Sequence, residues 1–345
     1  MPTLRNFSRH SLRQLCIVVL VCAGTAACTQ QSEDPNSLTV YSARQEHLIK
    51  PLFDRYTEET GVKIRYITDS AGALLQRLQA EGENTPADIL LTVDAGNLWQ
   101  AAHKNLLQPI DSAPLKQHIP KYLRDPQGRW FGLSVRARTI VYSTERVDAG
   151  ELSTYADLAE DKWRNRVCLR TAKKVYNQSL VAMLIVAQGE ARTQNIVRGW
   201  VNNLAAPPFA DDVAVMRAIE AGQCDVGIVN SYYFGRLQKD NPDIALALFW
   251  PNQQSNGVHV NISGAGVTRH ANNVDGATRL LEWLAAGEAQ ALFAKLNLEF
   301  PANPEIPPAQ QVQAWGDFEP NIINVSKAGE LQAEAVQLMD RAGYH

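Results

Sequence analysis

The feature that most constrains the fold is a regular alternation of short apolar runs and amphipathic segments along residues 38–107. Three runs have the composition of strands, and each is followed by a segment whose apolar residues recur at helical spacing. This alternation predicts an α/β domain. In order, the segments are LTVYSA, HLIKPLFDRYTEETG, VKIRYIT, ALLQRLQAEG, ADILLTV and AGNLWQAAHKNLL.

Residues 137–260 show the same alternation of strand-like and helical segments, which predicts a second α/β unit. The apolar runs VCLR and CDVGIV are each followed by a helical segment, beginning at YNQS and NSYY. The segment WFGLSVRARTIVYS is predicted to form two strand-like runs around a polar kink. Chain order predicts that VRARTIVY and HVNISGAGV both cross between the units, which gives two lobes over a cleft. Ligands of open α/β sheets bind beyond the carboxyl ends of the strands, so the cleft is the place to seek a site.

The N-terminus has the pattern of an export signal, and we expect residues 1–28 not to belong to the fold. A basic start is followed by the short apolar run LCIVVLVCAGTAA. The ending Ala26-Ala27-Cys28 resembles a lipoprotein cleavage site, with Thr25 where a large aliphatic residue is usual. Two alternatives stay open: lipid attachment at Cys28, or plain cleavage near Ala27. Either places the protein in the periplasm, and no later segment is apolar enough to span a membrane.

Charge and cysteine content narrow the function classes. The chain has 345 residues and a net charge of −3, and loss of residues 1–27 leaves 30 Lys and Arg against 36 Asp and Glu, a net charge of −6. A mildly acidic exported protein without basic runs is a poor candidate for nucleic-acid binding. Only Cys168 and Cys224 remain in the body of the chain. An oxidising compartment permits a disulfide between them, which we favour over two free thiols.

The sequence contains no recognisable catalytic constellation. The G-x-S-x-G, P-loop and H-E-x-x-H motifs are all missing from the 345 residues. His47 and His259 stand near expected strand ends, where surface or hinge roles are more common than metal ligation. Asp94 ends an expected strand, and an N-cap role explains it as well as a site carboxylate does. We therefore expect a protein that is not an enzyme.

Three tyrosines stand out because each directly follows an expected strand of the second unit. Tyr176 comes after VCLR, and Tyr232 and Tyr233 come after CDVGIV. A phenolate is a hard anionic oxygen, and a highly charged hard cation such as ferric iron stabilises it and displaces its proton. Lys173 and Lys174, beside the free N–H groups of the helix that starts at Tyr176, could hold a small anion. Two alternatives are ordinary packing residues and a sugar-stacking surface.

At these segments the sequence resembles the periplasmic ferric iron-binding proteins of bacterial ABC importers, a subgroup of the two-lobed solute-binding proteins. The resemblance covers essentially the whole mature chain, and YNQS and NSYY are its most specific parts. The other matching stretches are LTVYSARQEHLIKPLF, TPADILLTVDAGNLWQA, GLSVRARTIVY, HVNISGAGV and EFPANP.

The resemblance implies a set of site residues. Tyr176, Tyr232 and Tyr233 fall on the iron-ligand tyrosines, and Asn230 falls on a position that helps to bind a synergistic anion. Related proteins often have histidine and tyrosine where this chain has Gln45 and Glu46, so Glu46 is at best a replacement ligand. A three-tyrosine site completed by carbonate or another small anion is therefore expected. Arg44 and Arg138 are candidates for holding the anion, with structural ion pairs as the alternative role.

The same resemblance implies the organisation and role of the chain. It implies a two-lobed periplasmic-binding-protein fold, type II-like, with a double-strand hinge. The N-lobe would comprise 38–136 plus 263–312, and the C-lobe 137–262 plus 313–345. We expect a monomeric receptor that delivers Fe³⁺ to an inner-membrane ABC permease and its ATPase. The alternatives are a receptor for an organic anion such as an aminophosphonate, and a secreted hydrolase, which no residue set supports.

Overall fold

The computed structural model describes residues 36–345, which all fall within one compact unit. The predictions about the signal segment and lipid attachment at Cys28 lie outside the described residues. The strands are β1 (Ser37–Ser42), β2 (Lys63–Thr68), β3 (Ile89–Val93), β4 (Phe131–Ser143), β5 (Val167–Cys168), β6 (Val226–Asn230), β7 (Leu246–Phe249), β8 (Val260–Val267) and β9 (Phe300–Pro301).

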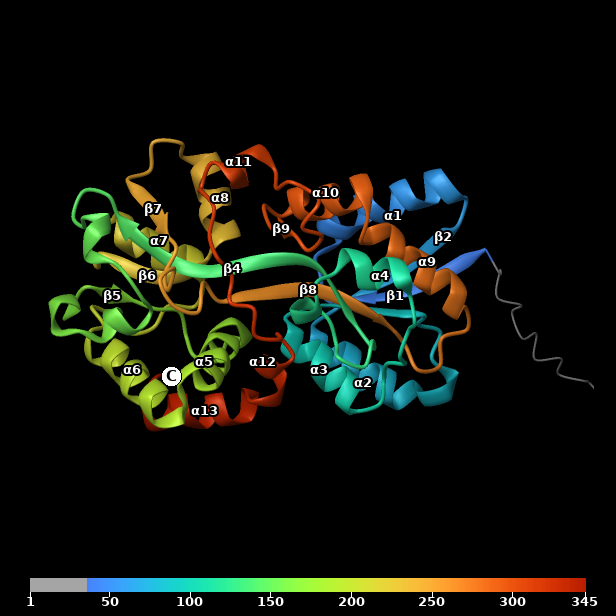
Figure 1. The fold of residues 1–345 in the computed structure, drawn as a ribbon, viewed down its shortest axis with the longest axis horizontal. Helices are drawn as coiled ribbons and strands as arrows, with labels where there is room; N and C mark the ends of the chain where they lie inside the picture. The colour runs from blue at the N-terminus through green and yellow to red at the C-terminus, as the bar shows by residue number, and fades with distance from the viewer. Residues whose placement is uncertain (1–35) are drawn as a thin grey trace, which may run out of the picture. The chain divides into compact units, whose positions relative to one another are not determined.

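The helices follow the predicted alternation (Figure 1). The first four are α1 (Glu46–Thr60), α2 (Ala71–Glu81), α3 (Ala95–His103) and α4 (Ala113–His118). The next four are α5 (Val175–Gln188), α6 (Glu190–Asn202), α7 (Asp212–Glu220) and α8 (Ser231–Asp240). The last five are α9 (Val274–Leu284), α10 (Gly287–Leu296), α11 (Gln310–Gln313), α12 (Lys327–Glu330) and α13 (Gln332–Arg341).

Local sequence explains where these helices begin, end and pack, as α1 illustrates. Its end is set by Gly61, which adopts φ 74° and donates its backbone N–H to the carbonyl of Thr57. Glycine is the residue that reaches this left-handed conformation without steric cost. The buried residues of α1 recur at helical spacing and form the face that packs on the sheet. They are Leu48, Ile49, Leu52, Phe53 and Tyr56.

The strands form one continuous hydrogen-bonded path, in the order β2-β1-β3-β8-β4-β6-β5. On one side, β1 pairs in parallel with β2 and β3, and β8 is antiparallel to β3 and β4. On the other side, β4 is antiparallel to β6 and β7, and β5 is parallel to β6. Figure 1 shows β4 and β8 running between the two halves. These are the two strands that the sequence predicted to cross between the units.

Strand β4 differs from its prediction. We expected two strand-like runs around a polar kink, and the structure has one strand from Phe131 to Ser143. At the expected kink the pairing is unbroken, since Arg136 pairs with Asn261 of β8 and Arg138 with Asn230 of β6. A shift of register occurs only earlier, between Gly132 and Ser134. The polar residues Arg136 and Arg138 do not interrupt the strand because both are buried and hydrogen-bonded. The prediction of two runs was therefore wrong, since it treated these arginines as solvated.

Separate apolar cores lie on the two sides of the crossing strands. One cluster contains residues of β1, β3, α1, α3 and α9, such as Leu38, Leu98 and Leu280. Two other clusters contain residues of β5, β6, α5, α7 and α13, such as Val181, Val215 and Leu338. Each lobe of this α/β fold thus has its own buried core, as independent domains do. The boundaries of the lobes stay a prediction.

The C-terminal segment contacts both halves of the fold. Val325 belongs to the cluster that contains β1 and β3, and its backbone N–H donates to the carbonyl of Tyr122. Ala335 belongs to the cluster that contains α5 and α6. Helix α12 lies between these residues and packs on both α3 and α5. The chain therefore passes between the two cores near residues 326–331, whereas the predicted lobe boundaries place its last crossing between residues 312 and 313.

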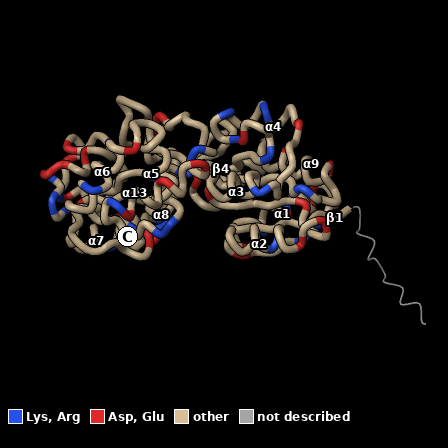
Figure 2. The backbone as a smooth tube through the Cα atoms, turned by 90° about the horizontal axis from the view of Figure 1, so that it is seen from below, with Lys and Arg blue, Asp and Glu red and all other residues tan. Residues whose placement is uncertain are grey.

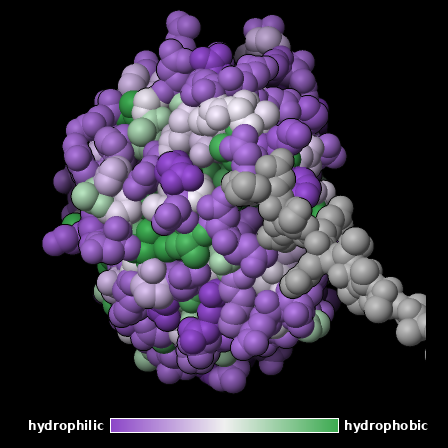
Figure 3. Space-filling view, turned by 90° about the vertical axis from the view of Figure 1, so that its right-hand side faces the viewer, coloured by the Kyte–Doolittle hydropathy of each residue, from purple (hydrophilic) through white to green (hydrophobic). Residues whose placement is uncertain are grey.

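The surface carries both signs of charge. Basic and acidic residues are interspersed along the backbone of both halves (Figure 2). The end face beside β2 and α9 is mostly hydrophilic, with one short row of apolar side chains near its centre (Figure 3). In the described part of the chain, no helix combines the length and the apolar composition needed to cross a membrane.

Candidate functional site

The three tyrosines singled out by the sequence lie together. Tyr176 is in the first turn of α5, and Tyr232 and Tyr233 are in the first turn of α8. The strands β5 and β6 that precede these helices are parallel neighbours, so their carboxyl ends share one edge of the sheet. The hydroxyl of Tyr232 donates to the hydroxyl of Tyr176 at 3.5 Å, and the rings of Tyr232 and Tyr233 are 4.3 Å apart between centroids. All three line one cavity of about 230 Å³.

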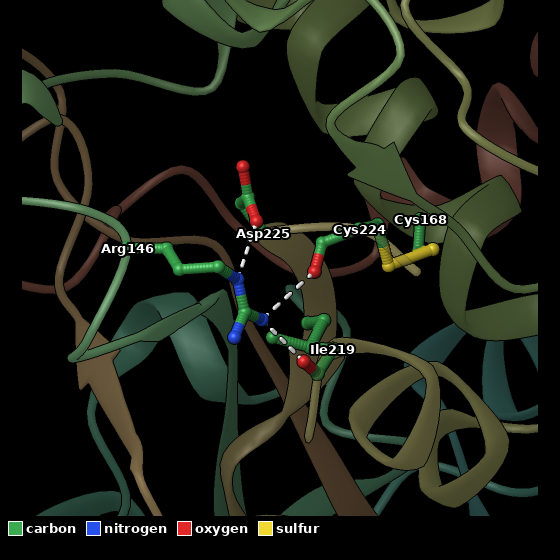
Figure 4. Close-up of a disulfide and its surroundings, with 5 residues drawn as sticks. All are labelled: Arg146, Cys168, Ile219, Cys224 and Asp225. Atoms are coloured by element: carbon green, nitrogen blue, oxygen red, sulfur yellow. Dashed lines mark hydrogen bonds and ion pairs between the residues drawn. A yellow bond between two sulfur atoms is a disulfide. The ribbon is translucent and has the colours of Figure 1, made fainter. Parts of the chain in front are cut away.

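A disulfide joins the chain segments that lead to the tyrosines (Figure 4). It connects Cys168, the last residue of β5, to Cys224, two residues before β6. Arg146 donates hydrogen bonds to Asp225 and to the carbonyls of Ile219 and Cys224. The disulfide and this arginine hold the start of β6 in place, and so brace the strands from which α5 and α8 emerge.

Four cationic side chains line the same cavity. Arg136 lies 5.1 Å and Lys174 5.0 Å from the centre of the Tyr176 ring, and Arg236 lies 5.3 Å from the centre of the Tyr232 ring. The fourth is Arg44, which follows β1. None of the described residues lining the cavity is Asp or Glu. The cavity is therefore positive as long as the phenols keep their protons.

Burial and charge act in opposite directions on the phenols. Burial raises the pKa of Tyr176 and raises that of Tyr232 further, although the Arg136 guanidinium lowers both. Burial lowers the pKa of Arg136, but its acidic neighbours Tyr176 and Glu299, with Tyr232 and Asp94, more than offset this and raise it overall. At neutral pH Tyr176 and Tyr232 are therefore protonated phenols beside a charged guanidinium, and a metal must displace their protons.

Arg44 is a buried arginine with unused hydrogen-bonding capacity. Its side chain is 1% exposed, and its Nη1 donates to Ser263 at 2.6 Å and to the carboxylate of Glu299 at 3.1 Å. Its Nε and Nη2 have no hydrogen-bond partner. Because an unpaired buried donor is costly, these two N–H groups are suited to a ligand oxygen in the cavity. Arg44 can therefore pair with Glu299 through Nη1 and still bind an anion through its other two nitrogen atoms.

Arg138 and Asn230 support the site from behind. Arg138 donates to the side chains of Asn177 at 2.9 Å and Asn230 at 3.2 Å, and forms a buried ion pair with Asp212 at 3.4 Å. It does not line the cavity. Asn230 in turn donates to the Tyr232 hydroxyl at 3.4 Å. Arg138 thus forms the structural ion pair that was its alternative role, and two successive hydrogen bonds through Asn230 connect it to Tyr232.

The remaining candidates lie around the mouth of the cavity. Gln45 lines the cavity, whereas the carboxylate of Glu46 accepts a hydrogen bond from the Tyr66 hydroxyl at 2.8 Å. Lys173 is exposed and does not line the cavity, unlike its neighbour Lys174. The role of Glu46 as a replacement ligand stays a prediction, since reaching the cavity would require it to leave Tyr66.

Asp94 and His259 are buried near the hinge strands. Asp94 caps α3 by accepting from the N–H of Gly96, and it also accepts from Ser179 and Asn261. Burial raises the pKa of Asp94, although Arg136 lowers it. Burial, with Arg138 and Arg136 adding to it, lowers the pKa of His259 to about 3, so its imidazole is neutral. The N-cap explanation of Asp94 therefore accounts for its position.

Three polar residues of the cavity escaped the reasoning from sequence: Arg136, Arg236 and Asn297. Two left a signal in the sequence. Arg136 is two residues before Arg138 in β4, a spacing that places both on one face of a strand. Arg236 is four residues after Tyr232 on a helix, so the two side chains are neighbours. Asn297 left no signal in the sequence, because it follows α10 and is far from the tyrosines along the chain. No group of three or more His, Cys, Asp or Glu side chains within residues 36–345 could hold a metal ion.

Comparison with known proteins identifies the class. The chain belongs to the bacterial extracellular solute-binding proteins, whose family profile matches residues 51–320. Among curated proteins it is 39% identical to iron uptake protein A1 of Synechocystis over 92% of both chains. It is also 41% identical to iron uptake protein A2 of the same organism over 91% of both chains. The prediction of family from sequence is confirmed.

Solved structures are similar over nearly the whole described chain. The Trichodesmium protein FutA, solved in complex with iron and citrate ligands, is 41% identical with a TM-score of 0.87, covering 90% of this chain and 100% of that one. Ferric iron-binding protein A of Mannheimia haemolytica, in an open conformation, is 36% identical with a TM-score of 0.84, covering 90% and 99%. The predicted two-lobed α/β fold is confirmed.

Proposed function

We propose that this protein is an extracytoplasmic receptor for ferric iron, with Tyr176, Tyr232 and Tyr233 as the metal ligands. The observation that carries the proposal is the convergence of these three phenols on one cavity of about 230 Å³. Relatives of about 40% identity named as iron uptake proteins support it. Members of this family bind solutes, which agrees with the expectation of a receptor and not an enzyme.

The chemistry of the three phenols suits a trivalent hard cation. Three phenolates carry the three negative charges that neutralise Fe³⁺, and their oxygens are hard donors. Binding releases the phenolic protons, since the metal takes only the deprotonated form. The neighbouring cations Arg136, Lys174 and Arg236 favour the phenolates by their charge. Their positive charge would also repel an Fe³⁺ ion that arrived without compensating anions.

A small anion completes the proposed site. The unpartnered N–H groups of Arg44, together with Arg136 and Lys174, offer donors and positive charge to a carbonate or another small anion. A cavity of about 230 Å³ has room for it beside the metal, because a water molecule occupies about 30 Å³ of liquid volume. The relative from Trichodesmium was solved with citrate as well as iron.

The family role places this receptor in an import system. We infer a periplasmic protein, exported as a monomer and with or without a lipid at Cys28, that passes iron to an ABC permease and its ATPase. Lobe closure on binding would be a hinge motion of β4 and β8. The class of the matching family, extracellular solute-binding proteins, supports this placement.

The test is ferric loading of the purified protein, followed by absorption spectroscopy with and without bicarbonate. The wild type should show the visible charge-transfer band of phenolate bound to iron. Replacing Tyr232 and Tyr233 by phenylalanine should abolish the band, whereas Tyr142→Phe, in β4 and not among the cavity residues, should leave it unchanged. A colourless wild-type protein without iron by elemental analysis would contradict the proposal.

The cations of the cavity also favour a second candidate, a receptor for an organic anion such as an aminophosphonate. Two distant relatives, 21–22% identical, are named as putative 2-aminoethylphosphonate-binding proteins. Isothermal titration separates the two functions. Such a receptor should bind the phosphonate without metal and should keep most of its affinity in the Tyr232→Phe/Tyr233→Phe variant, because the guanidinium groups remain.

A further inference from the structure

We propose that the hydrogen bond from Arg236 to Asn297 holds the two lobes together over the tyrosines, and that it sets the rate at which the cargo leaves. Below, it is called the interlobe bond. The proposal rests on the proposed function in that the cargo is ferric iron, but the bond itself belongs to the protein.

The two partners come from different lobes. Arg236 lies in α8, whose residues Phe234 and Leu237 are in an apolar cluster of the tyrosine-bearing half. Asn297 is the C-cap residue of α10, whose Phe293 is buried in the cluster around β1 and β3. Figure 1 shows α8 and α10 in different halves of the fold. The guanidinium Nη2 of Arg236 donates to Oδ1 of Asn297, and both residues line the cavity.

Arg236 also contacts the proposed ligands. Its guanidinium carbon lies 5.3 Å from the centre of the Tyr232 ring and 5.8 Å from the centre of the Tyr233 ring. A cation over an aromatic face is attracted to the ring, and the attraction grows when the phenol becomes a phenolate. One side chain thus contacts two of the three phenols and also reaches the opposite lobe.

On the other lobe, Asn297 is held by a buried charge network. Its Nδ2 donates to Oε1 of Glu299, which is fully buried. The other carboxylate oxygen of Glu299 accepts from Arg44 at 3.1 Å and from the hydroxyl of Ser134. Burial raises the pKa of Glu299, but Arg44 and Arg136 outweigh it and lower the pKa overall, so the carboxylate is charged. Because its amide nitrogen is committed to Glu299, Asn297 presents its oxygen to Arg236.

Close packing beside the interlobe bond supports the same conclusion. A side chain at Gly235 would place its Cβ 2.8 Å from Leu298 and 2.5 Å from Trp315. Leu298, next to Asn297, adopts φ 55°, a conformation that is uncommon for a leucine. The glycine therefore lets the 297–298 segment approach α8 closely enough for Arg236 to reach Asn297.

The experiment is a double-mutant cycle with Arg236→Met, Asn297→Ala and both together. Ferric iron is loaded, and its release to excess EDTA is followed at the charge-transfer band. Each single variant should speed release roughly fivefold to tenfold, and the double variant should be no faster than the faster single. The band should keep its wavelength, because the three phenols remain. Arg217→Met, an exposed arginine of α7 paired with Glu220, is the matched control and should change the rate less than about twofold.

A second measurement separates opening of the lobes from damage to the fold. Small-angle scattering of the loaded proteins should give a larger radius of gyration for either variant than for wild type. The melting temperature of unloaded Arg236→Met should be unchanged, whereas Asn297→Ala also loses a hydrogen bond to the buried Glu299 and should melt somewhat earlier. Gly235→Ala should also speed release, although alanine favours the helix. Additive effects in the cycle, or wild-type release and radius for Asn297→Ala, would overturn the proposal.

Failure of the proposed function gives a different result. If wild-type protein takes up no ferric iron, the receptor assignment fails, and the interlobe bond is then judged by scattering of the unloaded proteins alone. A larger radius for both single variants would support the bond, and identical radii for wild type and variants would overturn it.

Discussion

The two walls of the cavity are built from different chemistry. The C-lobe wall presents three phenols in the first turns of α5 and α8, above two parallel strands joined through a disulfide. The opposite wall presents Arg44, Gln45 and Asn297 from segments that follow β1 and α10, and Arg136 comes from the crossing strand β4. Both walls carry cations, since Lys174 and Arg236 lie on the C-lobe wall beside the tyrosines. Only the C-lobe wall offers groups that can become anionic oxygen donors, and the N-lobe wall offers a cation and amides.

This difference indicates which wall sets the affinity for the metal and which wall sets anion binding and release. Cationic groups repel Fe³⁺, so the N-lobe wall can favour the metal only through an anion or by stabilising phenolates. We therefore expect the C-lobe wall to supply most of the affinity and the N-lobe wall to govern the anion and the release rate. The predictions below follow that order, from the largest expected effect to the smallest.

The largest effect should come from the C-lobe wall. Tyr176→Phe removes one proposed donor oxygen and keeps the ring between Arg136 and Lys174. The ferric affinity should fall by more than about 100-fold, the upper range for residues that only support a ligand. Competition with citrate measures it. A loss below about tenfold would mean that the two walls share the metal more evenly than we propose.

Lowering the pH should weaken ferric binding through the phenols of the C-lobe wall. Because burial raises the pKa of Tyr176 and Tyr232, both phenols are protonated in the free protein at neutral pH. Binding then releases their protons, so affinity must fall as the pH falls and rise as the pH rises toward these elevated pKa values. The protons displaced from these two phenols alone predict a loss of at least about 100-fold between pH 7 and pH 6. Titration with a chelator at several pH values checks the slope, and a flat profile would contradict phenolate ligation.

Removing the disulfide tests whether the C-lobe wall needs this bond to position the tyrosines. Replacing Cys168 and Cys224 together by alanine should lower the free energy of unfolding by about 2–4 kcal/mol, because the bond closes a loop with a sequence separation of 56 residues. Denaturant titration measures this loss. Under conditions where the variant stays folded, its iron affinity should fall as well, since the strands below α5 and α8 lose their link. Unchanged affinity would show that the remaining packing positions the tyrosines alone.

The smallest effect should come from the N-lobe wall. The double variant Arg44→Met/Glu299→Gln removes both charges of the buried pair, because losing one partner alone leaves a costly unpaired charge. Ferric affinity in bicarbonate should fall by about tenfold, the lower end of the range for residues that support a ligand. In bicarbonate-free buffer, variant and wild type should bind alike. Equal anion dependence of the two proteins would exclude Arg44 as the anion donor.

Much of the fold and the tyrosine wall followed from sequence alone. Strands and helices are local patterns of apolar residues, and Tyr176, Tyr232 and Tyr233 come directly after strands. Parallel strands place their carboxyl ends at one edge, so the local patterns predict the meeting once the two strands are neighbours. That they are neighbours is a long-range pairing, of Val167 with Val226, which the structure supplies. The same reasoning failed on β4, where Arg136 and Arg138 read as a polar kink and are in fact buried.

What only the tertiary structure decided is the opposite wall and the roles of the arginines. Arg138 was a candidate for the anion, but Asp212 and Asn177 hold it behind the site, and its neighbour Arg136 lines the cavity. Arg44 is paired with Glu299, 255 residues away in sequence. Which cation reaches a cavity depends on partners brought together by the crossing strands, and no local pattern encodes them. The sequence by itself determined where the donor oxygens are, and the packing of the two lobes determined which charges face them.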